Sequence, residues 1–305
     1  MTSDNELELE KIEKELKALI NKAGLTLLDY FGKPLKVEYK DAHNTDPVTE
    51  VDRSVQDFLK KSIKEVFPDH SVIGEEDSDI SDEPLSKFIW VIDPLDGTRN
   101  FSQGLPIFAC SIGVLKEGKP VAGAIFIPAS NTDGNILHAV HGKGAYINNS
   151  RIKISKKNKP KAGSLAGLPG SFNNKYWFST KLDRIKGETR VLGSIAYELA
   201  MVASGVLQYS ALLGSLAIWD VAAGSIIIQE SGGSILVGNK GKSKTEWTKF
   251  ESFYTEFNNQ KINSKNLRQW RKPMIFGSDG IVDFISKNIK VQPYWKRQLR
   301  HLIGL

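Results

Sequence analysis

The sequence predicts a mixed α and β fold built from two closely packed subdomains. At 305 residues, the chain is longer than the roughly 250 to 300 residues that one hydrophobic core usually supports. Residues 106–147 show the apolar runs and turn residues of consecutive antiparallel strands. Residues 164–230 instead alternate short strands with helices. We therefore expect an N-terminal α+β subdomain over residues 1–150 and an α/β subdomain over residues 151–305.

Periodicity places the elements of the first subdomain. A helix is expected over residues 6–31, because Leu9, Ile12 and Leu16 fall on one apolar stripe. A second helix is expected over residues 51–66, with its apolar residues on one face. The expected strands cover residues 35–40, 72–74, 88–92, 108–115, 121–127, 136–140 and 145–147.

The second subdomain follows a strand and helix alternation. Strands are expected at residues 164–168, 189–192, 207–212 and 274–276. Helices are expected near residues 173–185, 194–204, 218–230 and 280–290. Residues 240–272 show little periodicity, which indicates an inserted loop or short hairpin.

The C-terminal part of the chain is basic. Residues 240–305 hold fourteen Lys and Arg against five Asp and Glu, and they supply the net charge of +6. Trp247, Trp270 and Trp295 lie among these basic residues. The pattern is typical either of a surface that binds nucleic acid or another polyanion, or of a lysine-rich surface around core tryptophans. No apolar stretch approaches 18 residues, and the chain starts with an acidic segment, so we expect a cytoplasmic protein with no membrane contact.

An aspartate motif follows the strand at residues 88–92. That strand ends at Asp93, Pro94 is expected to turn the chain out of the sheet, and Asp96 is expected to point back toward Asp93. Two carboxylates at one strand end repel each other, and a bound cation is the common relief. The alternative is a solvated turn, since Asp, Pro and Gly are ordinary turn residues.

Oxygen ligands favour a hard divalent ion. The chain has one cysteine and five scattered histidines, a poor set for zinc, so magnesium is the expected metal. Gly97 lets the backbone turn, and Thr98 places a hydroxyl where it can orient a water molecule.

Three further acidic segments accompany this motif. Glu75 and Glu76 follow the strand at residues 72–74, and Asp52 lies at the start of the helix over residues 51–66. Asp220 precedes the small residues Ala222, Ala223 and Gly224. Four independent surface turns would not explain this repeated placement of acids at the ends of apolar elements.

The chain resembles the inositol monophosphatase family of magnesium-dependent, lithium-sensitive phosphatases. The matching segments appear in family order and spread over most of residues 10–240; they are 47–52, 73–76, 90–101 and 219–224. The resemblance implies a layered αβαβα sandwich of the sugar-phosphatase type, with the active site between the two subdomains. It also implies a small phosphorylated metabolite as substrate and a possible homodimer.

The same resemblance implies a set of site residues. Glu75, Asp93 and the carbonyl of Leu95 would hold one Mg²⁺. Asp93, Asp96 and Asp220 would hold a second, with Asp93 bridging the two ions, and a third ion on Glu75 is possible. Thr98 would hydrogen-bond the attacking water, Asp52 would polarise that hydroxyl, and Glu75 would also lie near the water.

Phosphate hydrolysis by a metal-activated water would then rest on positioning and electrostatics. The backbone amides of Gly97 and Thr98 are expected to donate to the phosphate oxygens. Gly193 and Ser194 open a helix that either meets the substrate or is simply capped by the serine.

Leu213 stands where inositol-selective relatives carry an acid that accepts sugar hydroxyls. A leucine there would leave a buried hydroxyl without a partner, at a cost of roughly 1 to 3 kcal/mol. An inositol phosphate is therefore not the expected preference, and nucleotide 3′-phosphates, histidinol phosphate and fructose bisphosphate stay open. A rival reading keeps the fold as an RNA-binding or assembly module that uses the basic C-terminal region.

Overall fold

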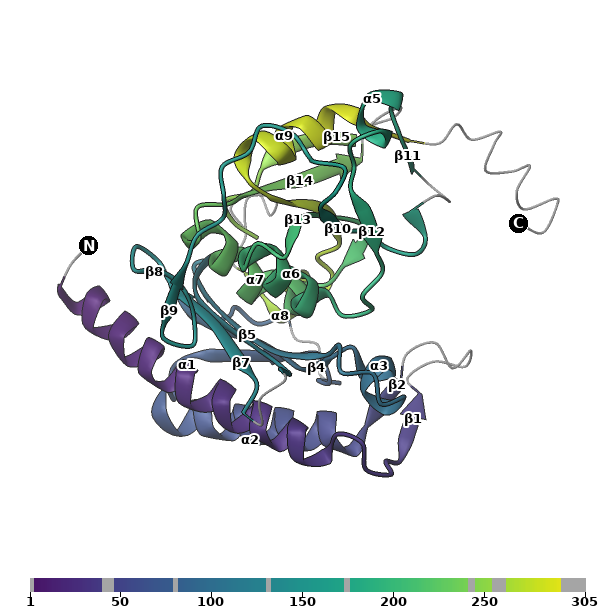
Figure 1. Cartoon of the computed structure of the whole chain (residues 1–305). Coiled ribbons are helices and arrows are strands. Elements are labelled where there is room, and N and C mark those ends of the chain that lie inside the picture. The colour runs from purple at the N-terminus through teal and green to yellow at the C-terminus, as the bar shows by residue number, and fades with distance from the viewer. Residues whose placement is uncertain are drawn as a thin grey trace.

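Helices and sheets of this protein alternate in five layers. The computed structural model describes residues 3–39, 47–78, 82–129, 133–172, 176–240, 245–253 and 262–291. A seven-stranded sheet and a six-stranded sheet lie on either side of a central helical layer, and further helices cover the outer face of each sheet (Figure 1). This arrangement confirms the predicted αβαβα sandwich.

The first layer consists of α1 (Ser3–Tyr30) and α2 (Glu50–Val66). Both helices pack their apolar stripes against the seven-stranded sheet, where Ile12, Leu16 and Leu59 are buried. Helix α2 begins at a capping box, because Thr49 caps the amide of Val51 while its own amide donates to the Asp52 carboxylate. The chain reaches α2 through a two-stranded sheet of β1 (Val37–Tyr39) and β2 (Pro47–Thr49).

The seven-stranded sheet follows the order of the chain. Its strands are β3 (Ser71–Gly74), β4 (Phe88–Asp96), β5 (Ala109–Lys116), β6 (Lys119–Ile127), β7 (Asn135–Val140), β8 (Gly144–Ile147) and β9 (Ser150–Ile152). Strands β3 and β4 are parallel. All later neighbours are antiparallel, which confirms the predicted meander.

Strand β4 continues past Pro94, so the expectation that this proline ends the strand is wrong. Asp93 pairs with Ser111, Asp96 pairs with Ala109, and the register shifts between the two pairs. Three steps along β4 therefore oppose two steps along β5. The missing N–H of the proline falls in this irregular stretch, where a ladder hydrogen bond is not required.

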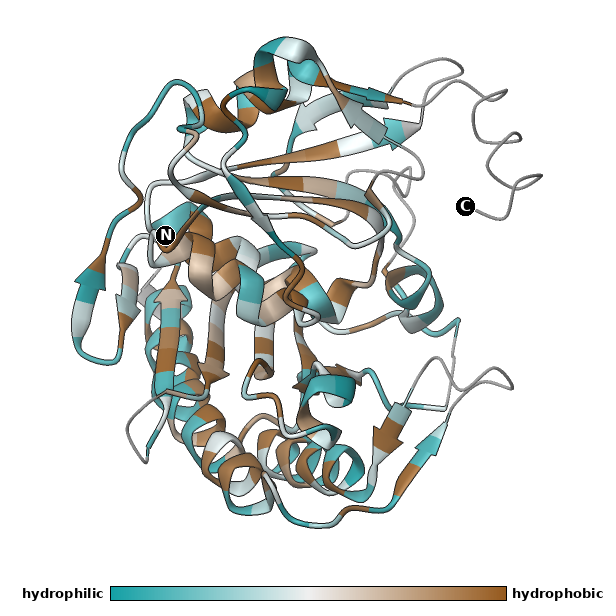
Figure 2. Ribbon diagram, turned by 45° about the vertical axis from the view of Figure 1, so that its right-hand side comes forward, coloured by the Kyte–Doolittle hydropathy of each residue, from teal (hydrophilic) through white to brown (hydrophobic). Residues whose placement is uncertain are grey.

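The central layer is formed by α6 (Ile195–Ala203) and α7 (Ile218–Glu230), which lie between the two sheets. Helix α7 is buried along nearly its whole length, and apolar residues recur along the central helices (Figure 2). Small residues bring α7 close to the first sheet. A Cβ on Gly113 would lie 2.6 Å from the Cβ of Ala222.

The six-stranded sheet has the order β12-β10-β13-β16-β14-β15. Its strands are β10 (Leu165–Gly167), β12 (Glu188–Arg190), β13 (Leu207–Leu216), β14 (Ser234–Lys240), β15 (Thr245–Lys249) and β16 (Lys272–Gly277). Strands β12, β10 and β13 are parallel, and the other pairs are antiparallel. Helix α9 (Asp279–Asn288) covers the outer face. The predicted division at residue 150 coincides with the start of β9 and stays a prediction.

The helix predicted near residues 173–185 is wrong over much of its length. Residues 173–175 lie outside the described part, Tyr176–Phe178 form β11, and only α5 (Thr180–Asp183) is helical. Three consecutive aromatic residues favour a strand, and β11 pairs with β17 (Ile289–Val291).

The basic segment at residues 240–272 contains a hairpin and a short helix. Strands β14 and β15 form the hairpin, and α8 (Ser264–Arg268) precedes β16. Residues 241–244 and 254–261 lie outside the described part, as does Trp295. Trp270 is buried against Phe253 in the core between the sheets. Within the described segments, none of the helices combines the length and the apolar character that crossing a membrane requires.

Candidate active site

Four of the predicted acidic residues come from element ends that meet near the central layer. Glu75 directly follows β3. Asp93 and Asp96 lie in the last four residues of β4, and Asp220 is in the first turn of α7. The amide of Glu75 donates to the carbonyl of Ile92 at 3.1 Å, which holds the end of β3 beside the end of β4. The parallel register thus brings the two strand ends to one edge of the sheet.

Asp93 is the most deeply buried acid of this group, with 1% of its surface exposed. Its Oδ1 accepts a hydrogen bond from the amide of Leu95 at 3.1 Å. Burial raises the pKa of Asp93 well above its usual value. The negative charges of Glu75, Asp96 and Asp220 raise that pKa further, so the four carboxylates share one electrostatic environment.

Asp96 joins the first sheet to the central helices. Its Oδ2 accepts from the Ser194 hydroxyl at 2.8 Å and from the amide of Ala196. Burial raises the pKa of Asp96 to about 7, although these two hydrogen bonds lower it. The same Ser194 caps α6 through the amide of Tyr197. Ser194 therefore serves both as a helix cap and as a partner of a predicted metal ligand.

Asp220 occupies the third position of α7. Its Oδ2 accepts from the amide of Ala217 at 2.7 Å, which closes the first turn of the helix. Burial raises the pKa of Asp220 well above its usual value, and the charge of Asp96 raises it further. The first turn of α7 thus presents a carboxylate to the edge where β4 ends.

Thr98 lies between two oxygen acceptors. Its Oγ1 is 3.1 Å from Asp52 Oδ1 and 2.9 Å from the carbonyl oxygen of Leu95. The other carboxylate oxygen of Asp52 accepts from the Thr49 amide at 2.8 Å and from the Thr49 hydroxyl. Burial raises the pKa of Asp52, and these hydrogen bonds lower it. The structure brings together the Thr98 and Asp52 pair that the sequence predicts.

Gly97 and Gly193 allow close approach of the two halves of the site. Gly97 has φ +90°, and a Cβ there would lie 2.9 Å from the Cβ of Ser194 and 3.0 Å from the carbonyl oxygen of Ile107. Gly97 is followed by the short helix α3 (Thr98–Ser102). Asn100 in α3 donates its side-chain amide to the carbonyls of Ile107 and Leu192 at 2.7 and 2.8 Å. Sequence reasoning missed this contact, which fixes the segment before Gly193.

A cavity of about 370 Å³ adjoins Asp96. Its wall contains Gly193, Ser194 and the carboxyl-bearing Glu198, and it is otherwise largely apolar, with Leu168, Leu212, Leu216 and Val191 among its lining residues. Leu213, which the sequence places at the substrate, is buried on the other face of the sheet in the cluster that α9 covers. Its neighbour Leu212 lines the cavity instead.

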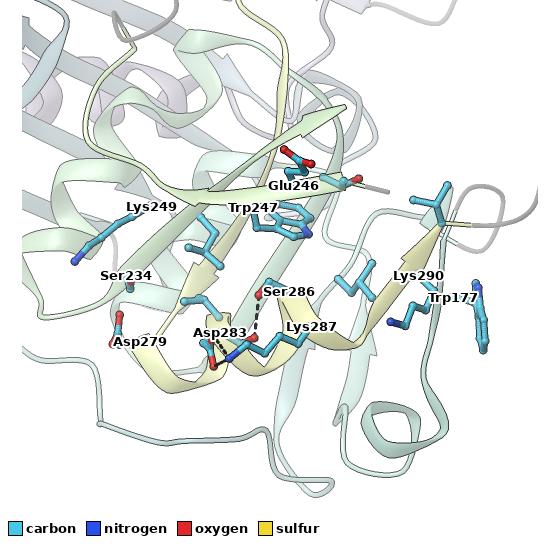
Figure 3. A pocket seen from close by; sticks show the side chains of 15 residues that line it. Trp177, Ser234, Glu246, Trp247, Lys249, Asp279, Asp283, Ser286, Lys287 and Lys290 are labelled. Atoms are coloured by element: carbon cyan, nitrogen blue, oxygen red, sulfur yellow. Dashed lines mark hydrogen bonds and ion pairs between the residues drawn. The ribbon is translucent and has the colours of Figure 1, made fainter. Parts of the chain in front are cut away.

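A larger cavity of about 920 Å³ lies away from the acids, between β14, β15 and α9 (Figure 3). Its lining mixes both charges, including Lys249, Lys290 and the ion pair between Asp283 and Lys287. None of the predicted site residues lines it. The smaller cavity is the better candidate site, because Asp96 and Glu198, whose pKa values burial raises to about 7, both line it.

The donor chemistry of the site fits a hard divalent cation. Carboxylates and the Leu95 carbonyl are all oxygen donors. Burial, and then mutual repulsion, raises the pKa values of Asp93 and Asp220, and a cation would stabilise their charged forms. In the described part of the chain, however, no three His, Cys, Asp or Glu side chains are grouped so that they could hold a metal ion. Asp93, Asp96 and Asp220 each turn one oxygen to a local donor, and the second oxygen of each carboxylate can serve as the ligand of a cation.

Comparison with known proteins gives consistent matches. The sequence model of the inositol monophosphatase family matches residues 8–269. A fructose-1,6-bisphosphatase/inositol-1-monophosphatase from Aquifex aeolicus is 35% identical over 217 residues, which cover 69% of this chain and 79% of the relative. The solved structure of a Thermotoga maritima IMPase has a TM-score of 0.67 and 27% identity, and the match covers 91% of this chain and 96% of that one.

An IMPase/NADP phosphatase complexed with Mg²⁺ and phosphate shares the fold. Its TM-score is 0.70 at 17% identity, with 94% of this chain and 99% of that chain covered. At that identity the likeness concerns the fold alone.

Proposed function

Because the chain belongs to the inositol monophosphatase family and is a phosphatase, we propose that it is a Mg²⁺-dependent phosphomonoesterase whose site is built from Asp52, Glu75, Asp93, Asp96, Thr98 and Asp220. One observation carries the proposal. Acids from two strand ends and one helix start gather around a single buried carboxyl, Asp93, whose pKa is raised first by burial and then by the charges of these acids. Such mutual repulsion is typical of a site that accommodates a cation.

The proposed metal ligands are Glu75, Asp93, Asp96, Asp220 and the carbonyl of Leu95. Bound divalent cations would neutralise the phosphate and stabilise the leaving oxygen. The chain's own contribution is to hold the ligands at the ends of rigid strands and at the first turn of a buried helix. Ser194 and the amide of Ala196 limit the freedom of Asp96, which keeps one of its oxygens on the α6 side.

Thr98 and Asp52 are proposed to position the attacking water. The Thr98 hydroxyl carries one proton, and it can donate that proton to Asp52 Oδ1 at 3.1 Å. Its lone pairs then accept a hydrogen bond from a water molecule, which is held in place for in-line attack. Asp52 stays oriented because the Thr49 amide and hydroxyl both donate to its second oxygen.

The substrate is proposed to be a small phosphorylated metabolite that fits the cavity of about 370 Å³ beside Asp96. The amides of Gly97 and Thr98 are proposed to meet the phosphate. Gly193 and Ser194 border the space for the rest of the molecule. Leu213 lies behind the sheet, so the cavity wall itself would select the substrate. There the buried Glu198 can accept a hydrogen bond from a hydroxyl of the substrate.

The decisive variant is Asp93→Asn. Wild-type protein should release phosphate from at least one of inositol 1-phosphate, adenosine 3′,5′-bisphosphate, histidinol phosphate and fructose 1,6-bisphosphate in the presence of Mg²⁺, and not with a chelator. Asp93→Asn should abolish this release while circular dichroism shows a folded chain. Asp183→Asn, which changes an exposed acid of α5, should behave like wild type. An Asp93→Asn protein that stays active would refute the assignment.

A further inference from the structure

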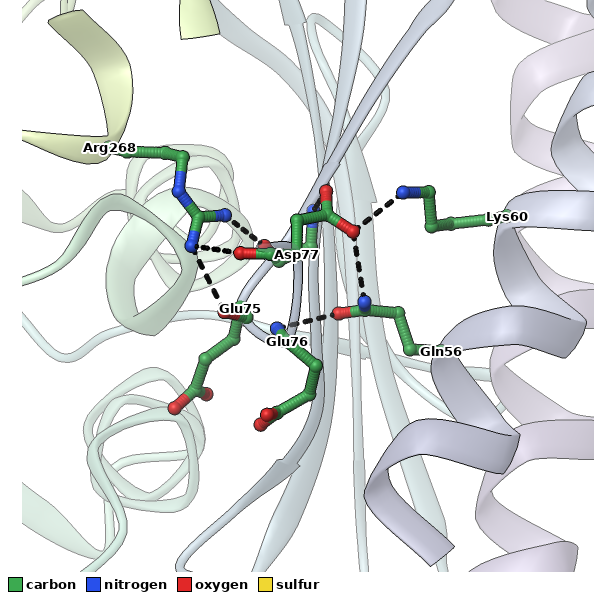
Figure 4. Close-up of polar contacts among 7 residues, drawn as sticks. Gln56, Lys60, Glu75, Glu76, Asp77 and Arg268 are labelled. Atoms are coloured by element: carbon green, nitrogen blue, oxygen red, sulfur yellow. Dashed lines mark hydrogen bonds and ion pairs between the residues drawn. The ribbon is translucent and has the colours of Figure 1, made fainter. Parts of the chain in front are cut away.

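Arg268 reaches from the basic C-terminal segment to the loop that carries Glu75. Arg268 is the last residue of α8, and more than 190 positions along the chain separate it from Gly74 and Glu75. Its Nη1 donates to the carbonyl of Gly74 at 2.6 Å. Its Nη2 donates to the carbonyls of Glu75 and Asp77 at 3.3 and 2.8 Å. One guanidinium thus holds three backbone carbonyls of a single turn (Figure 4).

The same guanidinium also contacts the segment that carries Asp220. Its Cζ lies 5.1 Å from the centroid of the Trp219 ring, and Trp219 immediately precedes Asp220 in the first turn of α7. Arg271 lies over the same ring at 5.5 Å and donates hydrogen bonds to the carbonyls of Arg268 and Trp270 in its own segment. Arg268 is therefore a direct link between the loop of Glu75 and the helix start of Asp220.

The loop of Glu75 is held from its other side by α2. Gln56 accepts from the amide of Glu76 at 3.0 Å, and Lys60 contacts Asp77 at 2.6 Å. Asp77 in turn accepts from the amide of Gly74 at 2.9 Å. In Figure 4 the Glu75 carboxylate points away from the guanidinium. The contact of Arg268 is consequently with the backbone that aims Glu75.

Arginine suits this place better than lysine. Its planar fork presents five N–H donors and can stack on an aromatic ring at the same time. A lysine ammonium has three donors on one atom and could not span the carbonyls of Gly74 and Asp77 while also contacting the Trp219 ring. A positive charge alone would not reproduce these contacts.

We propose that Arg268 is a positioning residue that aligns Glu75 with Asp220 and so sets the affinity of the site for its divalent cation. The inference rests on the proposed function, because it takes these two acids as metal ligands. It gives the basic segment before β16 a role inside the site. Changes to groups that orient metal ligands typically lower metal affinity or activity by about 10- to 100-fold, and we expect an effect in this range.

The test measures Mg²⁺ binding by calorimetry on the full chain without substrate, together with the Mg²⁺ dependence of phosphate release. Arg268→Ala and Arg268→Lys should both weaken Mg²⁺ binding by about 10- to 100-fold. The Mg²⁺ concentration for half-maximal activity should rise more than the rate at saturating Mg²⁺ falls. Lys265→Ala is the matched control, since Lys265 lies on the same helix and contacts the exposed Asp82 at 3.3 Å. It should bind Mg²⁺ like wild type.

The outcomes separate the two proposals. Folded Arg268 variants with Mg²⁺ affinity within twofold of wild type overturn the positioning role, even if their thermal stability falls. If Arg268→Lys alone binds Mg²⁺ like wild type, the positive charge is sufficient, and this result also overturns the positioning role. Arg268→Lys keeps the stem and charge, so it provides a folded variant if Arg268→Ala fails to fold. If wild type binds no Mg²⁺ and Asp93→Asn changes nothing, the proposed function itself fails.

Discussion

Glu198 predicts a measurable pH dependence of folding. This residue of α6 is 4% exposed, accepts a hydrogen bond from the Ser210 hydroxyl and lines the cavity beside Asp96. Burial raises its pKa from 4.5 to about 7. The hydrogen bond from Ser210 lowers this pKa, and the charge of Asp96 raises it, so desolvation is the dominant effect.

The sign and the size of the effect follow from this raised pKa. A glutamate in the unfolded chain loses its proton near pH 4.5, whereas the folded Glu198 keeps its proton up to about pH 7. The free energy of unfolding should therefore fall as the pH rises from 4.5 to about 7, and stay lower above that pH. At about 1.4 kcal/mol for each pH unit, the full loss is about 3 kcal/mol.

The perturbation is Glu198→Gln, which keeps the size and the acceptor for Ser210 but cannot ionise. Urea unfolding with a chelator present gives the free energy of unfolding at pH 4.5, 6 and 8. The variant should match wild type at pH 4.5 and exceed it by up to about 3 kcal/mol at pH 8. Glu65→Gln, which changes an exposed residue of α2, serves as the control. Parallel pH profiles for Glu198→Gln and wild type would refute the reasoning.

Two glycine substitutions probe the packing around the site. Gly97→Ala should destabilise the chain by about 1 to 2 kcal/mol from its positive φ alone, and it should lower phosphate release, because its Cβ would lie 2.9 Å from the Cβ of Ser194. Urea unfolding tests the stability and an activity assay tests the phosphate release; a variant that stays active and stable would contradict the close contact. Gly113→Ala should lower the free energy of unfolding by about 1 to 3 kcal/mol through overpacking, since its Cβ would lie 2.9 Å from the backbone of α7. Thermal unfolding tests this against Gly163→Ala, which should leave the melting temperature unchanged because its Cβ would enter open space.

The layers could be predicted from the sequence because burial leaves a periodic mark. The stripe of Ile12 and Leu16 in α1 and the apolar strands of the first sheet follow this rule. The course of β4 through Pro94 does not, because proline usually ends a strand and only the register shift against β5 makes room for it. Tyr176–Phe178 became a strand through pairing with β17, a contact more than 100 residues away in the chain.

The acids of the site could be predicted because several carboxylates at apolar element ends need a common explanation. Their partners could not. Asn100 and Arg268 act through backbone carbonyls of distant segments, and a carbonyl has no signature in the sequence. The position of Leu213 depends on which face of β13 it takes, and a register shift lies between Leu212 and Leu216. An alignment by residue spacing alone therefore does not determine which of these leucines reaches the cavity.

Ser194 shows why a local pattern cannot separate a structural role from a functional one. Its hydroxyl caps α6 through Tyr197 and also donates to Asp96. A hydroxyl has one proton and two lone pairs, so it can donate to the carboxylate while accepting from the helix amide. The cap therefore fixes the direction of the donated proton, and the fold of α6 becomes part of the geometry of Asp96. The helix cap and the contact with Asp96 are compatible, because one hydroxyl makes both, and contact of this serine with the substrate stays a prediction.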